Sequence, residues 1–372
     1  MCSSSEIIID EITGLIELSQ AKNILIICGK KSFFESGASE KLEALKTYCN
    51  IYFFNNFSKN PTIEDIHNGI KIFKSKNIDF IIAVGGGSAI DTAKLIRAFG
   101  VLNKKISKSD IESKKDFAKS KIPLVAIPTT YGSGSESTQF AVIYIDNQKF
   151  SVNSQYLLPN FYVLESELCL SLPKDIAASC SIDALSQAIE SFWSIKSTNK
   201  SKGYAKKAIG IIMENIEEAC KGNKKSIYLM LQASNLSGKA INISTTTAPH
   251  AISYPLTIFH NIPHGHAVAI TLGYFFEINF YCNKQNIQDL RGVAYLKETM
   301  QDLFNTLGCN NATECKQKWK ELMRALNLET SLKKLQIDKN DIERISEYIN
   351  IERLANNPVK ISSKEIKDIL YN

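Results

Sequence analysis

The pattern of apolar residues changes near residue 173, and this change limits most strongly what the chain can fold into. Before residue 173, apolar runs of strand length alternate with stretches of helical periodicity. After it, strand-like runs stop and helical periodicity continues. Strands separated by helices indicate βαβ units in a mostly parallel sheet. Because 372 residues exceed one ordinary core, we predict an α/β domain over 1–174 and an all-α domain over 175–372.

The bounds of the expected elements follow from the period of the apolar residues and from glycines and prolines, which often end helices and strands. In the first domain we predict strands over 24–28, 51–54, 80–84 and 122–127 and helices over 39–48, 64–74 and 89–99. A hairpin over 141–145 and 150–152 lies near the end of the sheet domain. In the second domain we predict helices over 176–193, 203–220, 226–241 and 266–282, with further helices after them.

Composition and charge exclude several classes of protein. The formal net charge of +6 is spread along the chain, whereas a nucleic-acid-binding protein more typically concentrates its lysines and arginines on one face. The nine cysteines are scattered without a Cys-x-x-Cys pair, which disfavours a zinc ribbon or a disulfide framework. Without a basic leader or a transmembrane-length apolar run, the sequence predicts a cytoplasmic protein with no membrane or nucleic-acid partner.

A glycine-rich segment follows the third predicted strand and opens a helix. Its residues 84–94 read Val-Gly-Gly-Gly-Ser-Ala-Ile-Asp-Thr-Ala-Lys. Glycines let the backbone approach a ligand closely, and a helix N-terminus offers N–H groups to a phosphate. We predict that Ser88 caps this helix in a capping box with Asp91. The loop alone does not separate a pyrophosphate site from a tight turn without ligand, although it lacks the P-loop pattern.

A second loop rich in glycine and hydroxyl groups follows the next strand and includes Thr129, Thr130 and Ser133. Ligands of open α/β sheets bind beyond the carboxyl ends of the strands. Two such loops at successive strand ends therefore favour a shared nucleotide site over a flexible surface loop.

Four of the five histidines lie within seventeen residues, at His250, His260, His264 and His266. Prolines precede His250 and His264, and we expect them to form rigid turns that aim the imidazoles. Neutral imidazole is a frequent ligand of zinc and ferrous iron, and such sites commonly add an anionic ligand. Asp183, which shares a helix face with Gln187 four residues later, is the candidate carboxylate. Without the histidine cluster, an ordinary partly exposed carboxylate would be the better interpretation of Asp183.

These motifs, in this order and over nearly the whole chain, resemble those of the iron-containing (group III) alcohol dehydrogenase family. The motifs on which this resemblance rests are Gly-Gly-Gly-Ser, Pro-Thr-Thr-x-Gly-Ser-Gly-Ser-Glu, Asp-Ala-Leu-Ser-x-Ala-Ile-Glu and Pro-His-Gly. The resemblance implies a Rossmann-like N-terminal domain, a helical C-terminal domain of the dehydroquinate-synthase-like architecture, and a site in the cleft between them. It implies metal ligation by Asp183, His250 and His264. It implies cofactor contacts by Gly86, Gly87, Ser88, Asn60, Thr129, Thr130, Ser133, Thr138 and Lys149.

Two positions depart from the family pattern, because Gln187 and Tyr254 stand where the family usually has histidines. The remaining Asp and two His resemble the three-ligand site of the related glycerol dehydrogenases. Gln187 could ligate through its carbonyl oxygen or leave room for water. Both Fe²⁺ and Zn²⁺ are therefore compatible with the ligand set.

The cofactor preference is inferred from a missing carboxylate. NAD-preferring members often carry an aspartate near the end of the second strand, and none is obvious here. Its absence relieves repulsion of a 2′-phosphate, which Lys30, Lys31 or Ser32 next to Gly29 could bind. We expect NADP to be preferred over NAD, the alternative being that both lysines are merely solvated.

Within the family, the segments around Gln187, Tyr254 and His264 resemble the phosphonoacetaldehyde reductase branch. The implied reaction is reversible NAD(P)H-linked reduction of a small aldehyde to a primary alcohol, with phosphonoacetaldehyde the best candidate. Tyr254, His266 and His260 are the candidate proton donors. We expect a homodimer or higher homo-oligomer. A dehydroquinate-synthase-like cyclase, a glycerol-dehydrogenase-like activity and a non-catalytic homologue stay open as alternatives.

Overall fold

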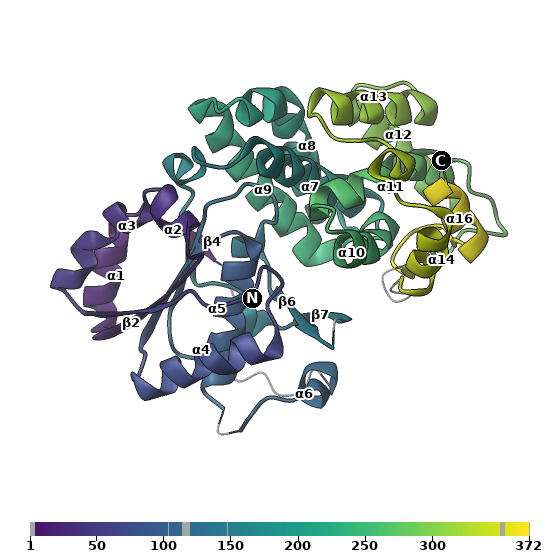
Figure 1. Ribbon diagram of the computed structural model, residues 1–372. Helices are drawn as coiled ribbons and strands as arrows, with labels where there is room; N and C mark the ends of the chain where they lie inside the picture. The colour runs from purple at the N-terminus through teal and green to yellow at the C-terminus, as the bar shows by residue number, and fades with distance from the viewer. Residues whose placement is uncertain (1–3, 103, 114–119, 147, 350–353, 372) are drawn as a thin grey trace. The chain divides into compact units, whose positions relative to one another are not determined.

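The computed structural model describes residues 4–102, 104–113, 120–146, 148–349 and 354–371. The chain divides into two compact units, 1–172 and 173–372 (Figure 1). This division lies two residues before the boundary predicted from the sequence. The N-terminal unit holds a sheet and helices, and the C-terminal unit is helical, which confirms the predicted fold class.

A six-stranded sheet forms the N-terminal unit, and all its neighbouring strands are parallel. Its spatial order is β1-β8-β5-β4-β2-β3. The four predicted strands are confirmed, whereas the two-residue β1 and β8 are too short to show a period. The strands are β1 (Ser5–Glu6), β2 (Asn23–Cys28), β3 (Asn50–Phe54), β4 (Phe80–Gly85), β5 (Leu124–Pro128) and β8 (Phe161–Tyr162).

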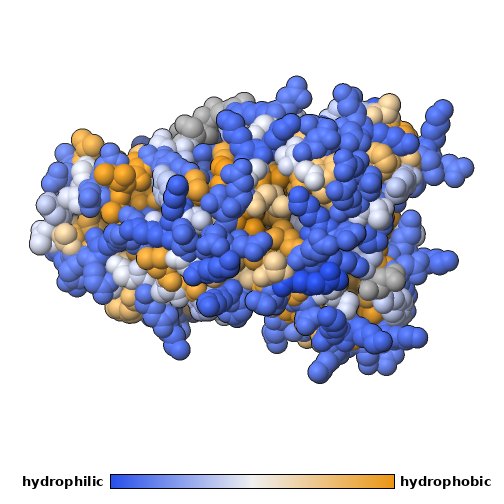
Figure 2. All heavy atoms as spheres, turned by 90° about the horizontal axis from the view of Figure 1, so that it is seen from above, coloured by the Kyte–Doolittle hydropathy of each residue, from blue (hydrophilic) through white to orange (hydrophobic). Residues whose placement is uncertain are grey.

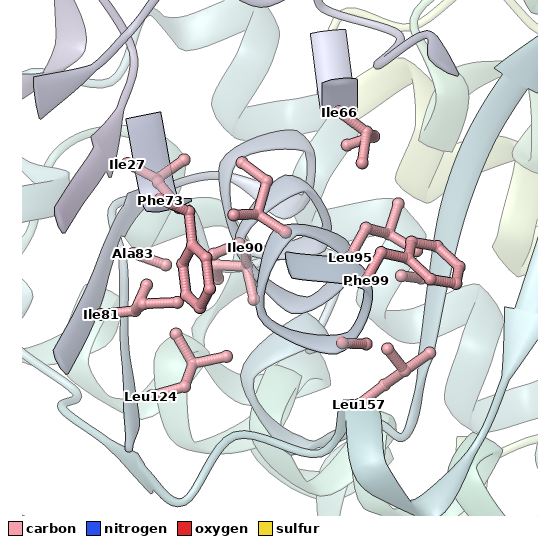
Figure 3. Packing of buried hydrophobic residues seen from close by; sticks show 14 of the residues in the cluster. Ile27, Ile66, Phe73, Ile81, Ala83, Ile90, Leu95, Phe99, Leu124 and Leu157 are labelled. Carbon is pink, nitrogen blue, oxygen red and sulfur yellow. The ribbon is translucent and has the colours of Figure 1, made fainter. Parts of the chain in front are cut away.

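Alternate residues of the central strands bury on opposite faces of this sheet. On one face, Ile81 and its neighbours pack under α4 (Ile63–Ser75) and α5 (Gly87–Gly100), as Figure 3 shows for Phe73 and Ile90. On the other face lie α1 (Glu11–Ser19), α2 (Ser32–Glu35), α3 (Ala38–Lys41) and the 3₁₀ helix η1 (Glu43–Thr47). Because both faces are covered, the strands are almost wholly apolar, which is why the sequence predicted them well.

The prediction of one continuous helix over 39–48 is wrong. The chain forms two short helices there, because α3 ends at Lys41 and the 3₁₀ helix η1 begins at Glu43. Leu42 and Leu45 are both buried against the sheet, and a spacing of three suits the tighter 3₁₀ pitch. The predicted hairpin is confirmed as β6 (Phe140–Ile145) and β7 (Gln148–Asn153), which pair antiparallel in a separate sheet.

The order of strands determines where a ligand can bind. Strand β2 pairs with β3 on one side and with β4 on the other, so the direction of winding reverses between β2 and β4. In doubly wound sheets the ligand crevice lies at this reversal, outside the carboxyl ends of the strands. The segments that begin at Gly29, Gly86 and Thr129 follow β2, β4 and β5 directly and therefore share one edge of the sheet.

The C-terminal unit is built around α7 (Lys174–Trp193), which is buried along most of its length and packs against α8, α9 and α11 (Figure 1). The helices predicted over 176–193, 203–220, 226–241 and 266–282 are confirmed with slightly different ends. Helix α10 was not predicted. The remaining elements are α8 (Asn199–Cys220), α9 (Lys224–Ser244), α10 (Ala248–His260), α11 (His264–Phe280), α12 (Gly292–Leu307), α13 (Ala312–Ala325), α14 (Lys339–Glu347) and α16 (Ser363–Tyr371). The short elements of the chain are α6 (Lys108–Ser113), η2 (Ser135–Ser137), η3 (Gln155–Leu157), η4 (Ser166–Cys169) and η5 (Leu332–Leu335).

The face drawn in Figure 2 is largely hydrophilic, with apolar side chains in groups between hydrophilic ones. Among the described residues, every helix is too short or too polar to cross a membrane.

Candidate cofactor loops and metal centre

The first loop differs from prediction in how its helix begins. Helix α5 begins at Gly87 with Gly86 as N-cap, so Ser88 lies inside the first turn and the predicted Ser88–Asp91 capping box is wrong. The Ser88 hydroxyl instead donates to the carbonyl of Lys59, next to Asn60. Because a helix that begins on glycine keeps its first N–H groups uncovered by a side chain, this N-terminus suits a phosphate.

The two predicted cofactor loops lie against each other. The Thr129 amide donates to the carbonyl of Gly85 over 3.1 Å, which fixes the start of the second loop beside β4. A Cβ on Gly86 would lie 3.4 Å from Thr130 Oγ1, and one on Gly87 would lie 3.1 Å from Ser133 Oγ. The two glycines thus lie where the hydroxyl groups of the second loop approach the helix N-terminus. Both loops therefore present one continuous polar surface.

The other predicted cofactor residues fall into two groups. Lys30 lies at the same sheet edge, where its Nζ donates to Asn56 Oδ1 over 2.9 Å, beside Gly29 at the end of β2. Thr138 is 1% exposed, and its hydroxyl accepts from Lys94 Nζ over 3.0 Å. Thr138 is therefore engaged inside the unit, and Lys149 lies on the hairpin strand β7.

The metal candidates come from three helices of the C-terminal unit. Asp183, Gln187 and Glu190 are spaced by four and three residues on α7, so they share one face of this buried helix. His250 is the third residue of α10, and His264 is the first residue of α11. The rigid turns predicted around Pro249 and Pro263 are instead helix starts, which is the position where proline is best tolerated.

Gly265 explains how α11 approaches α7 closely enough to bring His264 beside Asp183. A Cβ at Gly265 would overlap the carbonyl oxygen of Ser179 and would lie 2.7 Å from Asp183 Cβ. No larger residue fits without moving the helix. The glycine of the Pro-His-Gly motif thus sets the distance between the two ligand helices.

Ligand atoms of Asp183, His250 and His264 lie within 4.8 Å of one another. His250 Nε2 is 3.4 Å from Asp183 Oδ1, and two atoms about 2.1 Å from one ion at a tetrahedral angle also lie about 3.4 Å apart. In the part of the chain that the structure describes, Asp183 Oδ1, Gln187 Oε1 and His250 Nε2 are buried without hydrogen-bond partners. Buried polar atoms without partners are costly, and a cation would satisfy the two oxygens and, by replacing the proton on Nε2, the imidazole as well. The site therefore fits a divalent metal.

Glu190 was missed in the sequence, and it orients the site. Its side chain is fully buried, and its Oε1 accepts from the amide and hydroxyl of Thr247, each over 2.9 Å. Its Oε2 forms a short hydrogen bond with His250 Nδ1. A carboxylate on Nδ1 fixes the ring so that Nε2 faces Asp183, the arrangement typical of metal-binding histidines. The signal in the sequence is its spacing from Asp183 and Gln187.

Gln187 holds Asp183 from the other side. Its Nε2 donates to Asp183 Oδ2 over 3.0 Å, which leaves Oδ1 directed to the candidate metal position. Burial alone would lower the pKa of His250, but the charges of Glu190 and Asp183 raise this pKa to about 9. The two carboxylates beside His250 therefore favour a positive charge at this position.

The three candidate proton donors lie in different surroundings. The Tyr254 ring stacks on His264, with centroids 5.6 Å apart and planes 8° apart. His266 Nε2 is 2.7 Å from the Glu329 carbonyl, which can only accept, so this nitrogen must carry the proton; burial lowers the pKa of His266. His260 ends α10 and faces Asp341 at 3.8 Å, about 15 Å along the helix from His250. Of the three, Tyr254 therefore contacts a candidate ligand directly.

Comparison with known proteins gives the same family for both units. Residues 6–166 match the model "Iron-containing alcohol dehydrogenase", and residues 177–372 match "Fe-containing alcohol dehydrogenase family, C-terminal". Alcohol dehydrogenase 4 of Schizosaccharomyces pombe is 28% identical over 363 residues, 95% of this chain and 83% of that protein. Phosphonoacetaldehyde reductase of Streptomyces viridochromogenes is 30% identical over 243 residues, 62% of this chain and 60% of that protein.

A solved structure resembles the whole chain. Sulfoacetaldehyde reductase of Bifidobacterium kashiwanohense in complex with NAD⁺ aligns with a TM-score of 0.89 and 26% identity. The alignment covers 100% of this chain and 96% of that protein.

Proposed function

Because this chain belongs to the iron-containing alcohol dehydrogenase family and is an oxidoreductase of alcohols and aldehydes, we propose that it reduces a small anionic aldehyde to its primary alcohol. NADPH is the proposed reductant, and one divalent cation is the proposed metal. The observation that supports the proposal best is the group of ligand atoms from Asp183, His250 and His264 within 4.8 Å of one another, where Asp183 Oδ1 is buried without a hydrogen-bond partner among the described residues.

In this proposal Asp183, His250 and His264 hold the cation. When bound, the cation supplies a Lewis acid for the carbonyl oxygen, and the nicotinamide supplies the hydride. Gln187 keeps Asp183 in place through its Nε2, and its single side-chain oxygen, Oε1, is available as a weak fourth ligand. Glu190 binds Nδ1 of His250, so Nε2 is the nitrogen that would ligate once a cation replaces its proton.

Reduction also needs a proton at the alcohol oxygen, and Tyr254 is the proposed donor. Its ring lies parallel to that of His264, so it borders the ligand set. His266 is less suited because its Nε2–H is held by the Glu329 carbonyl. Replacing Tyr254 by phenylalanine should lower kcat by about 10²-fold and leave the metal content unchanged.

The cofactor proposal rests on the loops at the sheet edge. Gly86, Gly87 and Ser88 would receive the pyrophosphate, and Thr130 and Ser133 lie against these glycines. At the ends of β2 and β3 the side chains are Lys30 and Asn56, joined by a hydrogen bond. An ammonium group here, without an aspartate, favours the 2′-phosphate of NADPH over the free hydroxyl of NADH.

The proposed substrate is a two-carbon aldehyde with a tetrahedral anionic group. Two relatives support this choice, because one is a phosphonoacetaldehyde reductase and the other a sulfoacetaldehyde reductase. Both aldehydes carry an oxyanion group one carbon from the carbonyl. Phosphonoacetaldehyde, reduced to 2-hydroxyethylphosphonate, is the first candidate.

The test is a substrate panel with the purified protein. Phosphonoacetaldehyde, sulfoacetaldehyde and propanal are each assayed with NADPH and with NADH, after Fe²⁺ or Zn²⁺ is restored to metal-free protein. The proposal expects net NADPH consumption and a kcat/KM at least about tenfold higher for an anionic aldehyde than for propanal. Equal turnover of all three aldehydes would refute the substrate proposal, and the absence of any metal-dependent turnover would refute the reaction.

A further inference from the structure

The N-terminal unit buries a cation that the reaction does not use. Lys94, in the middle of α5, is 0% exposed. Its Nζ donates to Ser135 Oγ over 2.9 Å, to Thr138 Oγ1 over 3.0 Å and to the Phe140 carbonyl over 2.8 Å. An ammonium group has three donors, and each of them has an acceptor here.

Asp91, one turn earlier on α5, completes this cluster. Its Oδ1 is 3.5 Å from Lys94 Nζ and accepts a short hydrogen bond from Ser135 Oγ. Its Oδ2 accepts from the Val142 amide over 2.9 Å. One face of α5 therefore binds a continuous segment that runs from Ser135 in η2 into strand β6.

This bound segment is the direct continuation of the second cofactor loop. The loop starts at Thr129, which is fixed to Gly85, and reaches Ser133 against Gly87. Gly134, with φ of 58°, then turns the chain into the segment that Lys94 holds. The loop is thus fixed at its start by the sheet and at its end by a buried charge on the same helix whose N-terminus it faces.

We propose that Lys94 and Asp91 are positioning residues for the dinucleotide, because they set the spacing between the N-terminus of α5 and the hydroxyl groups of Thr130 and Ser133. This inference rests on the proposed function. In this inference Thr138 affects dinucleotide binding indirectly, because its hydroxyl accepts a hydrogen bond from Lys94.

The test compares two variants of α5. Lys94→Met combined with Asp91→Asn removes both charges of this pair together, so that neither is left buried without the other. Arg97→Met is the matched control, because Arg97 is 3% exposed on the same helix, yet its guanidinium binds Asn160 and the carbonyls of Tyr156 and Leu158. These partners precede β8 and do not belong to the cofactor loops.

NADPH dissociation constants are measured by fluorescence titration, with metal content and thermal unfolding measured on the same samples. The double variant should bind NADPH at least about tenfold more weakly with an unchanged metal content. Arg97→Met should lower the unfolding temperature and change NADPH affinity by less than about threefold. Thr138→Val, which removes one acceptor and keeps the shape, should weaken NADPH binding by about threefold even if the double variant does not fold.

Wild-type affinity in a folded double variant, or in Thr138→Val, would overturn this inference. An equal loss of NADPH affinity in Arg97→Met would also overturn it, because the effect would then be general destabilisation. If the wild-type protein bound neither NADPH nor NADH, the proposed function itself would fail.

Discussion

The two units each bury a polar cluster, and the clusters differ in whether their groups are satisfied. Around Lys94 every ammonium donor meets an acceptor, and Asp91 is bonded at both oxygens. Around Asp183, by contrast, three buried side-chain atoms lack hydrogen-bond partners among the described residues, and ligand atoms of Asp183, His250 and His264 lie within 4.8 Å of one another. A satisfied buried network stabilises and positions the chain, whereas unsatisfied convergent acceptors indicate a binding site.

The largest expected effect comes from removing a ligand at the unsatisfied cluster. Asp183→Ala and His264→Ala should each abolish metal retention and lower kcat/KM by more than about 10³-fold, because two ligands hold a cation poorly. Metal analysis and aldehyde reduction measure this. Asp289→Asn, which alters a buried carboxylate paired with Arg291 elsewhere in the unit, should retain its metal. Full activity of Asp183→Ala would defeat the scheme.

The next largest effect is expected at Gly265, where an added methyl group would push α11 away from α7. Gly265→Ala should cost about 1–3 kcal/mol in the free energy of unfolding and reduce metal affinity by about 10²-fold. Denaturant unfolding and metal titration check both. The control is Gly203→Ala in α8, where a Cβ meets open space and helix propensity should raise stability by about 0.5–1 kcal/mol. Unchanged metal affinity in Gly265→Ala would contradict the packing argument.

Part of the fold and part of the candidate site could be predicted from the sequence. The central strands were predictable because both their faces are buried and apolar, and the grouping of the candidate ligands Asp183, His250 and His264 because their motifs are local. Helix α10 was missed because Pro249 suggested a rigid turn, although this proline lies in the first turn of the helix.

The supporting contacts could not be predicted in the same way. Glu190 meets His250 sixty residues later, and Lys94 meets Thr138 forty-four residues later. Such pairs depend on how helices and loops pack, which local periodicity does not encode. The capping box at Ser88 failed for a related reason, because Asp91 is used by the hairpin instead.

Glu190 should have a smaller effect on the metal centre than the ligands themselves. Glu190→Gln keeps the shape but loses the negative acceptor for His250 Nδ1 and for the groups of Thr247. Metal affinity should fall by about 10- to 100-fold, as expected for a residue that orients a ligand. Isothermal titration calorimetry with Zn²⁺ measures this change in metal affinity. A change below twofold would show that the ring needs no such support.

The satisfied cluster predicts a dependence of stability on pH. Burial lowers the pKa of Lys94 from 10.5 to about 8. Between these values Lys94 is protonated in the unfolded chain and largely deprotonated in the folded chain. The free energy of unfolding therefore rises as pH increases above about 8, and this gain is lost as pH falls back through about 8. The free energy of unfolding of the wild type, relative to Lys94→Met, should therefore rise by about 1 kcal/mol per pH unit from pH 8 to 10. A pH-independent difference would contradict this.

The smallest expected effect is at Gln187, one of the two positions that depart from the pattern implied by the resemblance. Gln187→Ala should reduce metal affinity by about threefold to tenfold, because it removes a hydrogen bond to Asp183 and at most a weak ligand. Gln187→His should raise Zn²⁺ affinity by about tenfold or more, because imidazole is a stronger ligand than an amide oxygen. Competition with a coloured chelator measures both. Weaker binding by Gln187→His would show that the position cannot reach the cation.

The most direct measurement of the central claim is an anomalous-difference map from crystals of the chain grown with Zn²⁺ or Fe²⁺, recorded at the absorption edge of that metal. We expect one peak per chain, at about 2.0–2.2 Å from Asp183 Oδ1, His250 Nε2 and an imidazole nitrogen of His264. A peak elsewhere, or these three side chains without a peak in saturating metal, would contradict the account.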